Sequence, residues 1–271
     1  MNEVELRQLY IEEHKSLKEI AKIFNVCPQR VHQRMKQLNI PRRTISDAGR
    51  NRHRKITPYH MDDTFWETWT PNLAWFLGLF YADGHIATGR DRAAITAKDI
   101  EFLGQIRDML QSNFRIQTKA TTPQLIINSM DRVEMLESFG ITRAKTYNML
   151  CPIIPPHLRS HFVRGFFDGD GWVSGTTHRR ISVGFEISSK NFADEFASII
   201  QEETNIQASR NVRDRRGDIR TGGHANIHSN HIIYGIRVYC SNAIKFLHWI
   251  YQDSTPENRW EYKYLKALPF L

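Results

Sequence analysis

Two stretches decide the fold that the sequence predicts: PNLAWFLGLFYADG at residues 71–84 and HFVRGFFDGDG at residues 161–171. Each is an apolar segment that ends in an aspartate followed by a glycine. Small residues recur at every fourth position, which places them on one face of a helix. They are Ala74, Gly78 and Ala82 in the first stretch and Gly165 and Gly169 in the second. Faces without bulky side chains let two helix backbones approach closely, so we predict that these two helices pair.

The paired helices are predicted to end with their aspartates, Asp83 and Asp170, next to one another. Gly84 and Gly171 follow them, and glycine after a helix commonly takes a left-handed conformation. A helix C-terminus carries partial negative charge and neighbouring carboxylates repel, so this placement is unfavourable by itself. A divalent cation removes both problems, because carboxylate oxygens suit Mg²⁺. Ordinary buried helices with Asp-Gly turns would explain one such motif, but the repeat favours a metal site.

The segments FLGLFYADG (76–84) and VRGFFDGDG (163–171) resemble the signature of the LAGLIDADG homing endonucleases. The second segment has Asp168 at the inner acidic position of the signature, whereas the first departs from it with Tyr81. The resemblance implies an α+β fold, namely a pseudo-two-fold pair of αββαββα half-domains with saddle-shaped antiparallel sheets. It also implies that the inner acid is structural and that the terminal acids are catalytic.

The function implied by the resemblance is site-specific, Mg²⁺-dependent cleavage of both strands of double-stranded DNA at a long recognition site. Residues 70–150 and 151–271 would form the two halves of a monomer with no obligate protein partner. Two or three metal ions would lie at the helix pair, held by Asp83, Asp170, Gly84 and Gly171. The basic residues that the family places behind its acids would be Lys145 in the first half and Arg259 or Lys263 in the second.

Two alternatives remain open at this point. Degenerate members of the family are DNA-binding transcriptional regulators without catalytic activity, and others are RNA maturases for introns. The presence of both terminal acids, Asp83 and Asp170, favours the nuclease over the regulator.

Each half is predicted to run helix, two strands, helix, two strands, helix. Alternation of polar and apolar residues predicts strands at 85–88, 93–97, 115–119, 124–128, 172–174, 181–188, 208–213 and 232–239. Helical spacing, with Ile100 among the inward residues of the first helix, predicts further helices at 99–110, 131–139, 192–203 and 241–252.

Residues 1–45 are predicted to form a small all-α domain. Ser16 and Glu19 form a capping box, Asn25 suits the tight turn, and Pro28 suits the start of a third helix. The arrangement resembles a bacterial helix-turn-helix. Its outward face would read base edges through Gln29, Arg30, His32, Gln33, Arg34 and Lys36. A solvated polar face is the alternative.

Residues 46–69 are predicted to form a basic linker. Basic residues at the end of the preceding domain and at the start of this linker would follow the DNA phosphates. They are Arg42, Arg43, Arg50, Arg52, Arg54 and Lys55. In the body, the strands and turns would contact DNA through Arg90, Arg92, Lys98, Arg115, Lys119, Arg179, Arg180, Glu186, Lys190, Arg210, Arg213, Arg215, Arg216, Arg220 and Arg237.

The charge distribution supports a polyanionic partner. Residues 1–60 contain 13 Lys and Arg against 6 Asp and Glu, so they carry +7 of the formal net charge of +8. Three widely spaced cysteines argue against a disulfide framework or a thiolate zinc site. The longest apolar run is too short to cross a membrane. We expect an intracellular protein of the cytoplasm or nucleoid of a bacterium or phage-infected cell, or of an organelle.

Overall fold

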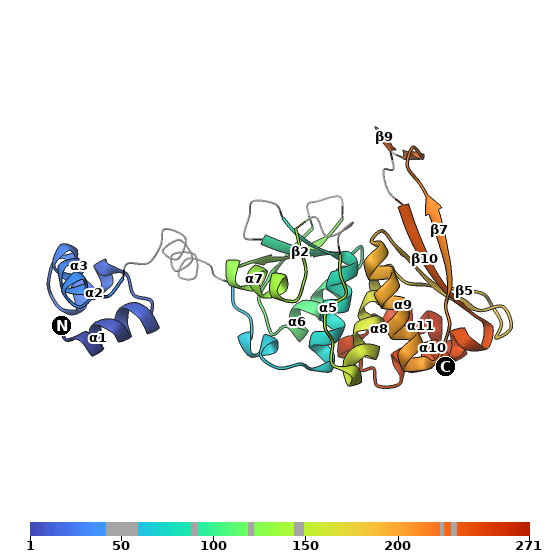
Figure 1. Ribbon diagram of the computed structural model, residues 1–271, viewed down its shortest axis with the longest axis horizontal. Coiled ribbons are helices and arrows are strands. Elements are labelled where there is room, and N and C mark those ends of the chain that lie inside the picture. Colours follow the sequence, from blue (N-terminus) through green and yellow to red (C-terminus); the bar gives the residue numbers. More distant parts are fainter. Residues whose placement is uncertain (42–58, 88–91, 119–121, 144–148, 223–224, 229–231) are drawn as a thin grey trace. The chain divides into compact units, whose positions relative to one another are not determined.

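The computed structural model describes residues 1–41, 59–87, 92–118, 122–143, 149–222, 225–228 and 232–271. The chain forms two compact units, residues 1–57 and 58–271 (Figure 1). The linker predicted to extend to residue 69 is therefore too long at its C-terminal end. Met61 and Trp66 are apolar side chains that bury themselves in the core of the second unit, so the segment around them belongs to that unit.

The described part of the first unit, residues 1–41, contains three helices around an apolar core. It contains α1 (Glu3–Arg7), continued by a π-helical turn η1 (Gln8–Glu12), then α2 (Leu17–Ile23) and α3 (Pro28–Gln37). Ser16 and Glu19 form the predicted capping box, and Asn25 takes the positive φ of 49° that the turn requires. The buried residues of the three helices are Leu6, Tyr10, Ile20, Ala21, Val31 and Met35.

The second unit repeats one topology twice, as predicted. The first half contains α5 (Pro71–Asp83), β1 (Gly84–Ile86), β2 (Arg92–Thr96), α6 (Ile100–Met109), β3 (Arg115–Gln117), β4 (Gln124–Asn128) and α7 (Met130–Ser138). The second half contains α8 (Arg159–Asp170), β5 (Trp172–Ser174), β6 (Ser182–Ile187), α9 (Lys190–Thr204), β7 (Ser209–Asp214), β10 (Ile232–Tyr239) and α10 (Cys240–Tyr251).

The two sheets are antiparallel and have matching strand orders, β1-β2-β4-β3 and β5-β6-β10-β7. This confirms the predicted α+β class and the repeat. A two-stranded sheet of β8 (Ile219–Gly222) and β9 (Ala225–His228), which the sequence did not predict, lies at the end of the ribbon formed by β7 and β10 (Figure 1). A helix near the end of the second half, α11 (Glu261–Ala267), was also not predicted.

Helices α5 and α8 pair through their small residues, side by side at the centre of the unit (Figure 1). A β-carbon on Gly78 would lie 2.8 Å from the backbone nitrogen of Phe166, and one on Gly165 would lie 2.8 Å from that of Leu79. Both would come closer still to a backbone carbonyl oxygen of the facing helix. Glycine is therefore required at the crossing because the two backbones touch there.

The conformation predicted for Gly84 and Gly171 is wrong. Both are extended, with φ of −82° and −76°, and neither is left-handed. Glycine is needed for space instead: a β-carbon on Gly84 would lie 2.5 Å from the carbonyl oxygen of Phe80, and one on Gly171 would lie 2.7 Å from that of Phe167. Each chain turns directly from the helix into the first strand of its sheet.

Helix α6 differs from the prediction at its first residue. Ile100 is not inward as expected but is 48% exposed, because α6 begins at this residue and turns it to the surface.

Within the described residues, none of the helices combines the length and the apolar character that crossing a membrane would need.

Candidate functional site

The two terminal aspartates meet at the ends of the paired helices. Asp83 is the last residue of α5 and Asp170 the last residue of α8. A β-carbon on Gly169 would lie 2.9 Å from Asp83 Oδ2, so the Asp83 carboxylate lies against the backbone one residue before Asp170. Asp83 is partly exposed and Asp170 is exposed. The arrangement brings two carboxylates to one accessible place.

Lys263 lies at the same place. Its Nζ donates hydrogen bonds to the carbonyl oxygens of Phe167 at 3.4 Å and Gly169 at 3.5 Å, and to that of Gly171. Burial lowers the pKa of Lys263, while the negative charges of Asp168, Asp83 and Asp170 oppose this change by favouring the ammonium form. Its ammonium therefore partly balances the carboxylates and the negative end of α8.

Arg259, another of the predicted basic residues, is bonded elsewhere. Arg259 Nε donates to Glu261 at 3.0 Å, and its guanidinium lies 3.6 Å from the centre of the Tyr264 ring. Lys145 lies outside the described residues. Of the two candidates in the second half, Lys263 is the one that reaches the aspartates.

The inner acid Asp168 is fully buried and forms no part of the exposed site. Its Oδ2 accepts hydrogen bonds from Trp75 Nε1 at 2.8 Å and from the Trp260 backbone nitrogen at 2.9 Å, and its Oδ1 accepts one from the Tyr251 hydroxyl at 3.2 Å. Burial raises the pKa of Asp168 to about 6, although the hydrogen bonds from Trp75 and Trp260 act in the opposite direction. In the first half, Tyr81 takes this position and donates to the Phe139 carbonyl at 2.9 Å.

Comparison with known proteins identifies the family. The family model described as the LAGLIDADG-like domain matches residues 70–140 and 158–247, more than half of the chain. The chain belongs to this LAGLIDADG-like family. Its two matched segments correspond to the two halves of the second unit. No protein of curated function matches the chain in sequence.

Three solved structures are similar to the chain. A mesophilic variant of the homing endonuclease I-DmoI is 16% identical, with 68% of this chain and 97% of that chain covered and a TM-score of 0.47. Full-length DUF199/WhiA from Thermatoga maritima is 10% identical, with 76% and 62% covered and a TM-score of 0.46. The homing endonuclease I-WcaI bound to its DNA recognition sequence is 14% identical, with 74% and 90% covered and a TM-score of 0.46. At these identities and scores, the function has to be argued from the residues of this chain.

Each LAGLIDADG-like sheet turns one polar face away from the helices. In the second half, the strand register places Glu186, Arg213 and Arg237 on this face, while Val183, Phe185 and Ile236 face the core. In the first half, Arg92 and Arg115 share the corresponding face. The same register adds polar residues that the sequence analysis missed, although alternation with buried neighbours could have found them: His85, Gln117, Gln124, Asn128 and Asn211.

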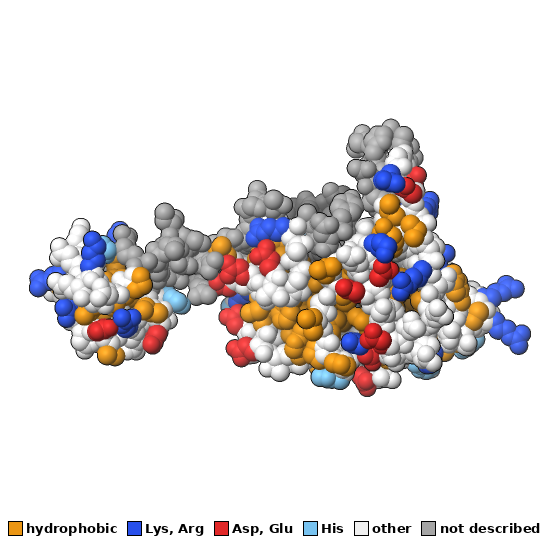
Figure 2. Space-filling view, in the orientation of Figure 1, with side chains coloured by type: hydrophobic (Ala, Val, Ile, Leu, Met, Phe, Trp, Pro, Cys, Tyr) orange, Lys and Arg blue, Asp and Glu red, His pale blue; other side chains and the backbone are white. Residues whose placement is uncertain are grey.

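Several predicted DNA-contacting residues of the body are bonded to carboxylates. Arg210 lies across from Ile236, on the helix side of the sheet, and bonds Asp194 at 2.8 Å. Lys190 bonds the same carboxylate at 2.7 Å. Figure 2 shows acidic and basic side chains mixed along the ribbon of β7 and β10. The sequence could not show this pairing, because the partners of Arg210 and Lys190 depend on how α9 packs under the sheet.

Two more arginines of the ribbon have acidic neighbours. Arg216 bonds Asp214 through Nε at 2.9 Å and through a terminal nitrogen at 2.6 Å. Arg215 lies 3.5 Å from Glu186. Lys98, Arg179 and Arg180 are exposed. Arg220 belongs to β8, and Arg90 and Lys119 lie outside the described residues.

In the first unit, the predicted reading face of α3 is only partly open. Gln29, Arg30, Gln33 and Lys36 are exposed. Arg34 and His32 are partly covered, and Arg34 donates to the Met1 carbonyl at 3.4 Å and to Gln37 at 3.1 Å. The six basic residues predicted to contact DNA between positions 42 and 55 lie outside the described residues.

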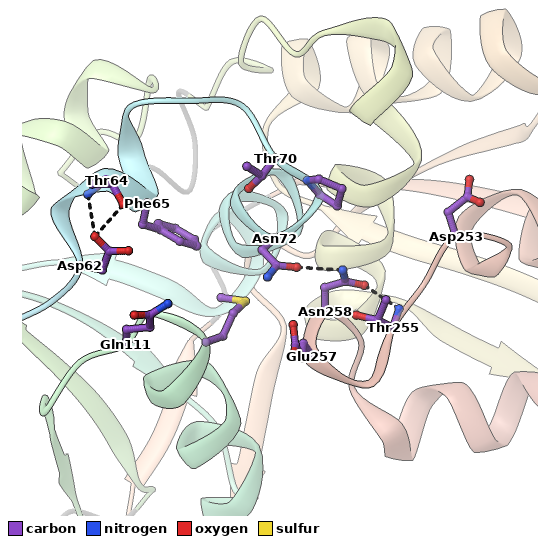
Figure 3. A pocket seen from close by; sticks show the side chains of 12 residues that line it. Asp62, Thr64, Phe65, Thr70, Asn72, Gln111, Asp253, Thr255, Glu257 and Asn258 are labelled. Atoms are coloured by element: carbon purple, nitrogen blue, oxygen red, sulfur yellow. Dashed lines mark hydrogen bonds between the residues drawn. The ribbon is translucent and has the colours of Figure 1, made fainter.

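A pocket of about 450 Å³ lies at the opposite end of α5 from Asp83. Figure 3 shows the Asn72 and Asn258 side chains pointing toward each other across its floor, where they form a 2.9 Å hydrogen bond. Three acidic residues, Asp62, Asp253 and Glu257, line it, and none of its described lining residues is basic. The pocket therefore does not suit a phosphate and is separate from the paired carboxylates.

The donor set at the helix ends fits a divalent metal only in part. Asp83 and Asp170 supply two hard carboxylates, but no group of three or more His, Cys, Asp or Glu side chains among the described residues could hold an ion by itself. The predicted ligand Gly171 directs its carbonyl oxygen to Lys263. Mg²⁺ commonly keeps several waters and is bound through one or two carboxylates plus substrate phosphates, so this sparse set is compatible with it.

Proposed function

We propose that this LAGLIDADG-like protein is a divalent-metal-dependent endonuclease that cuts both strands of double-stranded DNA at a specific site. The observation that carries the proposal is the meeting of Asp83 and Asp170 at the ends of two helices whose backbones touch. Such close packing restricts the sequence, because it excludes a side chain at Gly78 and Gly165. It is explained if the two carboxylates have to act together.

Asp83 and Asp170 would hold Mg²⁺, with water and the scissile phosphates completing the coordination. When bound, the metal supplies an activated water and stabilises the leaving oxygen of the phosphodiester. The Lys263 ammonium would stabilise negative charge near the cut phosphate in the second half. One carboxylate from each half gives the simplest route to cutting each of the two strands.

The polar faces of the two sheets would lie in the major groove. Arg92 and Arg115 in one half, and Arg213 and Arg237 in the other, lie on these faces by their strand register, and there they would contact bases or phosphates. The exposed part of α3 would add a separate helix-turn-helix contact, and the basic segment after it would follow phosphates. The protein would act as a monomer in the compartment that holds its DNA.

The test is cleavage of a randomised duplex library with Mg²⁺, followed by cleavage of a selected duplex. We expect double-strand cuts that EDTA abolishes and that Asp170→Asn removes. Asp108→Asn, which changes an exposed carboxylate of α6 that pairs with neighbouring Arg107, is the matched control and should cut normally. Specific DNA binding without any cutting would contradict the nuclease function and favour the DNA-binding regulator. Binding to structured RNA alone would favour the maturase.

A further inference from the structure

The segment before Lys263 is held by the other half of the protein. We call residues 256–260 the C-terminal connector. Gln105, on α6 of the first half, donates from Nε2 to the carbonyl oxygens of Pro256 at 2.9 Å, Glu257 at 3.1 Å and Arg259 at 2.9 Å. An amide nitrogen has two hydrogens, so three carbonyls share one donor group. Together with Arg164 of α8, whose Nε donates to the Asn258 carbonyl at 2.8 Å, this side chain holds the connector in place.

Trp260 attaches the end of the connector to both halves. Its ring stacks on Phe102 of α6, with 4.8 Å between centres and 19° between planes, and its Nε1 donates to Asp99 at 3.0 Å. Its backbone nitrogen donates to Asp168 of α8. Trp260 is also the residue that precedes α11. The start of α11 is therefore set by α6 of the first half and by α8 of the second.

Lys263 lies in the first turn of α11, and there its Nζ contacts the carbonyl groups at the end of α8. The helix has only seven residues, and a helix of this length is unstable without tertiary support. Lys263 therefore depends for its position on tertiary contacts, namely those made by the connector and those made within α11 by Tyr264 and buried Ala267.

The first half ends with a similar exchange. The segment of residues 149–151, which we call the central connector, is held by α9 of the second half. Ser189 Oγ donates to the Met149 carbonyl at 2.7 Å, and the Cys151 backbone nitrogen donates to Glu195 at 2.7 Å. Asp99 and Ser189 occupy equivalent places, since each caps the second helix of its half. Each connector is thus bonded by the half that it does not follow, and the C-terminal connector is bonded by α8 of its own half as well.

We infer that the C-terminal connector positions Lys263, so that α6 of the first half sets the basic group beside the carboxylate of the second half. Gln105 and Trp260 are positioning residues in this arrangement and touch no substrate. Its consequence is that the two halves have to be docked before the second cutting centre is complete. This consequence for cutting rests on the proposed function; the placement of Lys263 does not.

The placement can be tested without DNA by mapping the acetylation of lysines by mass spectrometry. In Gln105→Leu, which removes the shared donor, we expect Lys263 to react about tenfold faster, as for a local opening that forfeits one or two net hydrogen bonds. Gln105→Glu, which sets a carboxylate against three carbonyl oxygens, should increase the rate further. The exposed Lys245 is the internal reference, and Gln201→Leu, at an exposed position of α9, is the control variant. Equal Lys263 rates in all four proteins would overturn the inference, and so would an equal rise at Lys245.

Cleavage then tests the consequence. At saturating duplex, Gln105→Leu should cut about tenfold more slowly than Gln201→Leu, with the same affinity for DNA in Ca²⁺, and should accumulate duplex that is cut in one strand. Faster acetylation with an unchanged cutting rate would show that the position of Lys263 does not matter to the chemistry. If the unaltered chain cuts no DNA, the proposed function fails while the acetylation result still decides the placement.

Discussion

Replacing Gly165 with alanine should force α5 and α8 apart. The new β-carbon would lie 2.8 Å from the Leu79 nitrogen and closer to the Trp75 carbonyl, whereas ordinary contact begins at 3.4 Å. The helices must therefore separate by at least about 0.6 Å, since backbone atoms cannot rotate away as a side chain can. A gap of this size already removes about a quarter of the dispersion attraction between facing atoms.

The expected cost is about 3–5 kcal/mol, above the usual range for overpacking because the clash is with backbone on both sides. For a unit of the size of residues 58–271, this corresponds to a decrease of about 6–20 °C in Tm. Near-ultraviolet circular dichroism during heating measures it, because the buried aromatic residues around the helix pair report on their packing.

Gly104→Ala is the matched control. Gly104 lies within α6, and a β-carbon there would meet nothing within 4 Å among the described residues. Alanine is the better helix former by about 1 kcal/mol, so this variant should melt at the same temperature or slightly higher. A Tm for Gly165→Ala within about 2 °C of the unaltered protein, well below the expected decrease, would refute the close backbone contact, and with it the physical reason given for the meeting of the carboxylates.

Three further outcomes are expected. Asp83→Asn and Asp170→Asn should each abolish double-strand cleavage and leave specific binding within about twofold, because neither carboxylate lies on a polar sheet face; full cutting by either variant in Mg²⁺ would contradict the paired-carboxylate site. Removal of residues 1–57 should preserve cleavage, shorten the footprint on one side and reduce the slope of log affinity against log salt by roughly 0.9 for each phosphate that the first unit neutralises in the full-length chain; equal slopes and footprints would show that the first unit does not bind this DNA. Buried His161 accepts a hydrogen bond at Nδ1 from Arg164 at 2.7 Å, and its pKa is lowered to about 4, mainly by burial. Folding therefore favours the neutral ring. The stability that this contributes is present above pH 6.5 and disappears as the pH falls toward 4, by about 3 kcal/mol at most. His161→Gln keeps an acceptor and should not show this decrease, and comparing the two proteins removes the opposite effect of Asp168; parallel pH profiles of the free energy of unfolding would disprove the assignment.

The sequence by itself determined the helix pair and the repeat. Small residues at every fourth position are a local pattern, and they predict close helix packing wherever the partner helix comes from. Alternation likewise predicted the strands and the polar faces, because it is set by the geometry of one strand. The capping box at Ser16 and the turn at Asn25 were predictable for the same reason.

Only the tertiary structure decided which basic residue joins the aspartates. Lys263 and Arg259 are four residues apart and look equally suitable in the sequence, but contacts from distant residues such as Gln105, about 150 positions earlier, hold the segment so that only Lys263 lies at the end of α8. The sequence could not predict the pairing of Arg210 with Asp194 or the extended conformation of Gly84 for the same reason. Each depends on atoms that the folded chain brings close from distant positions, and no local pattern records them.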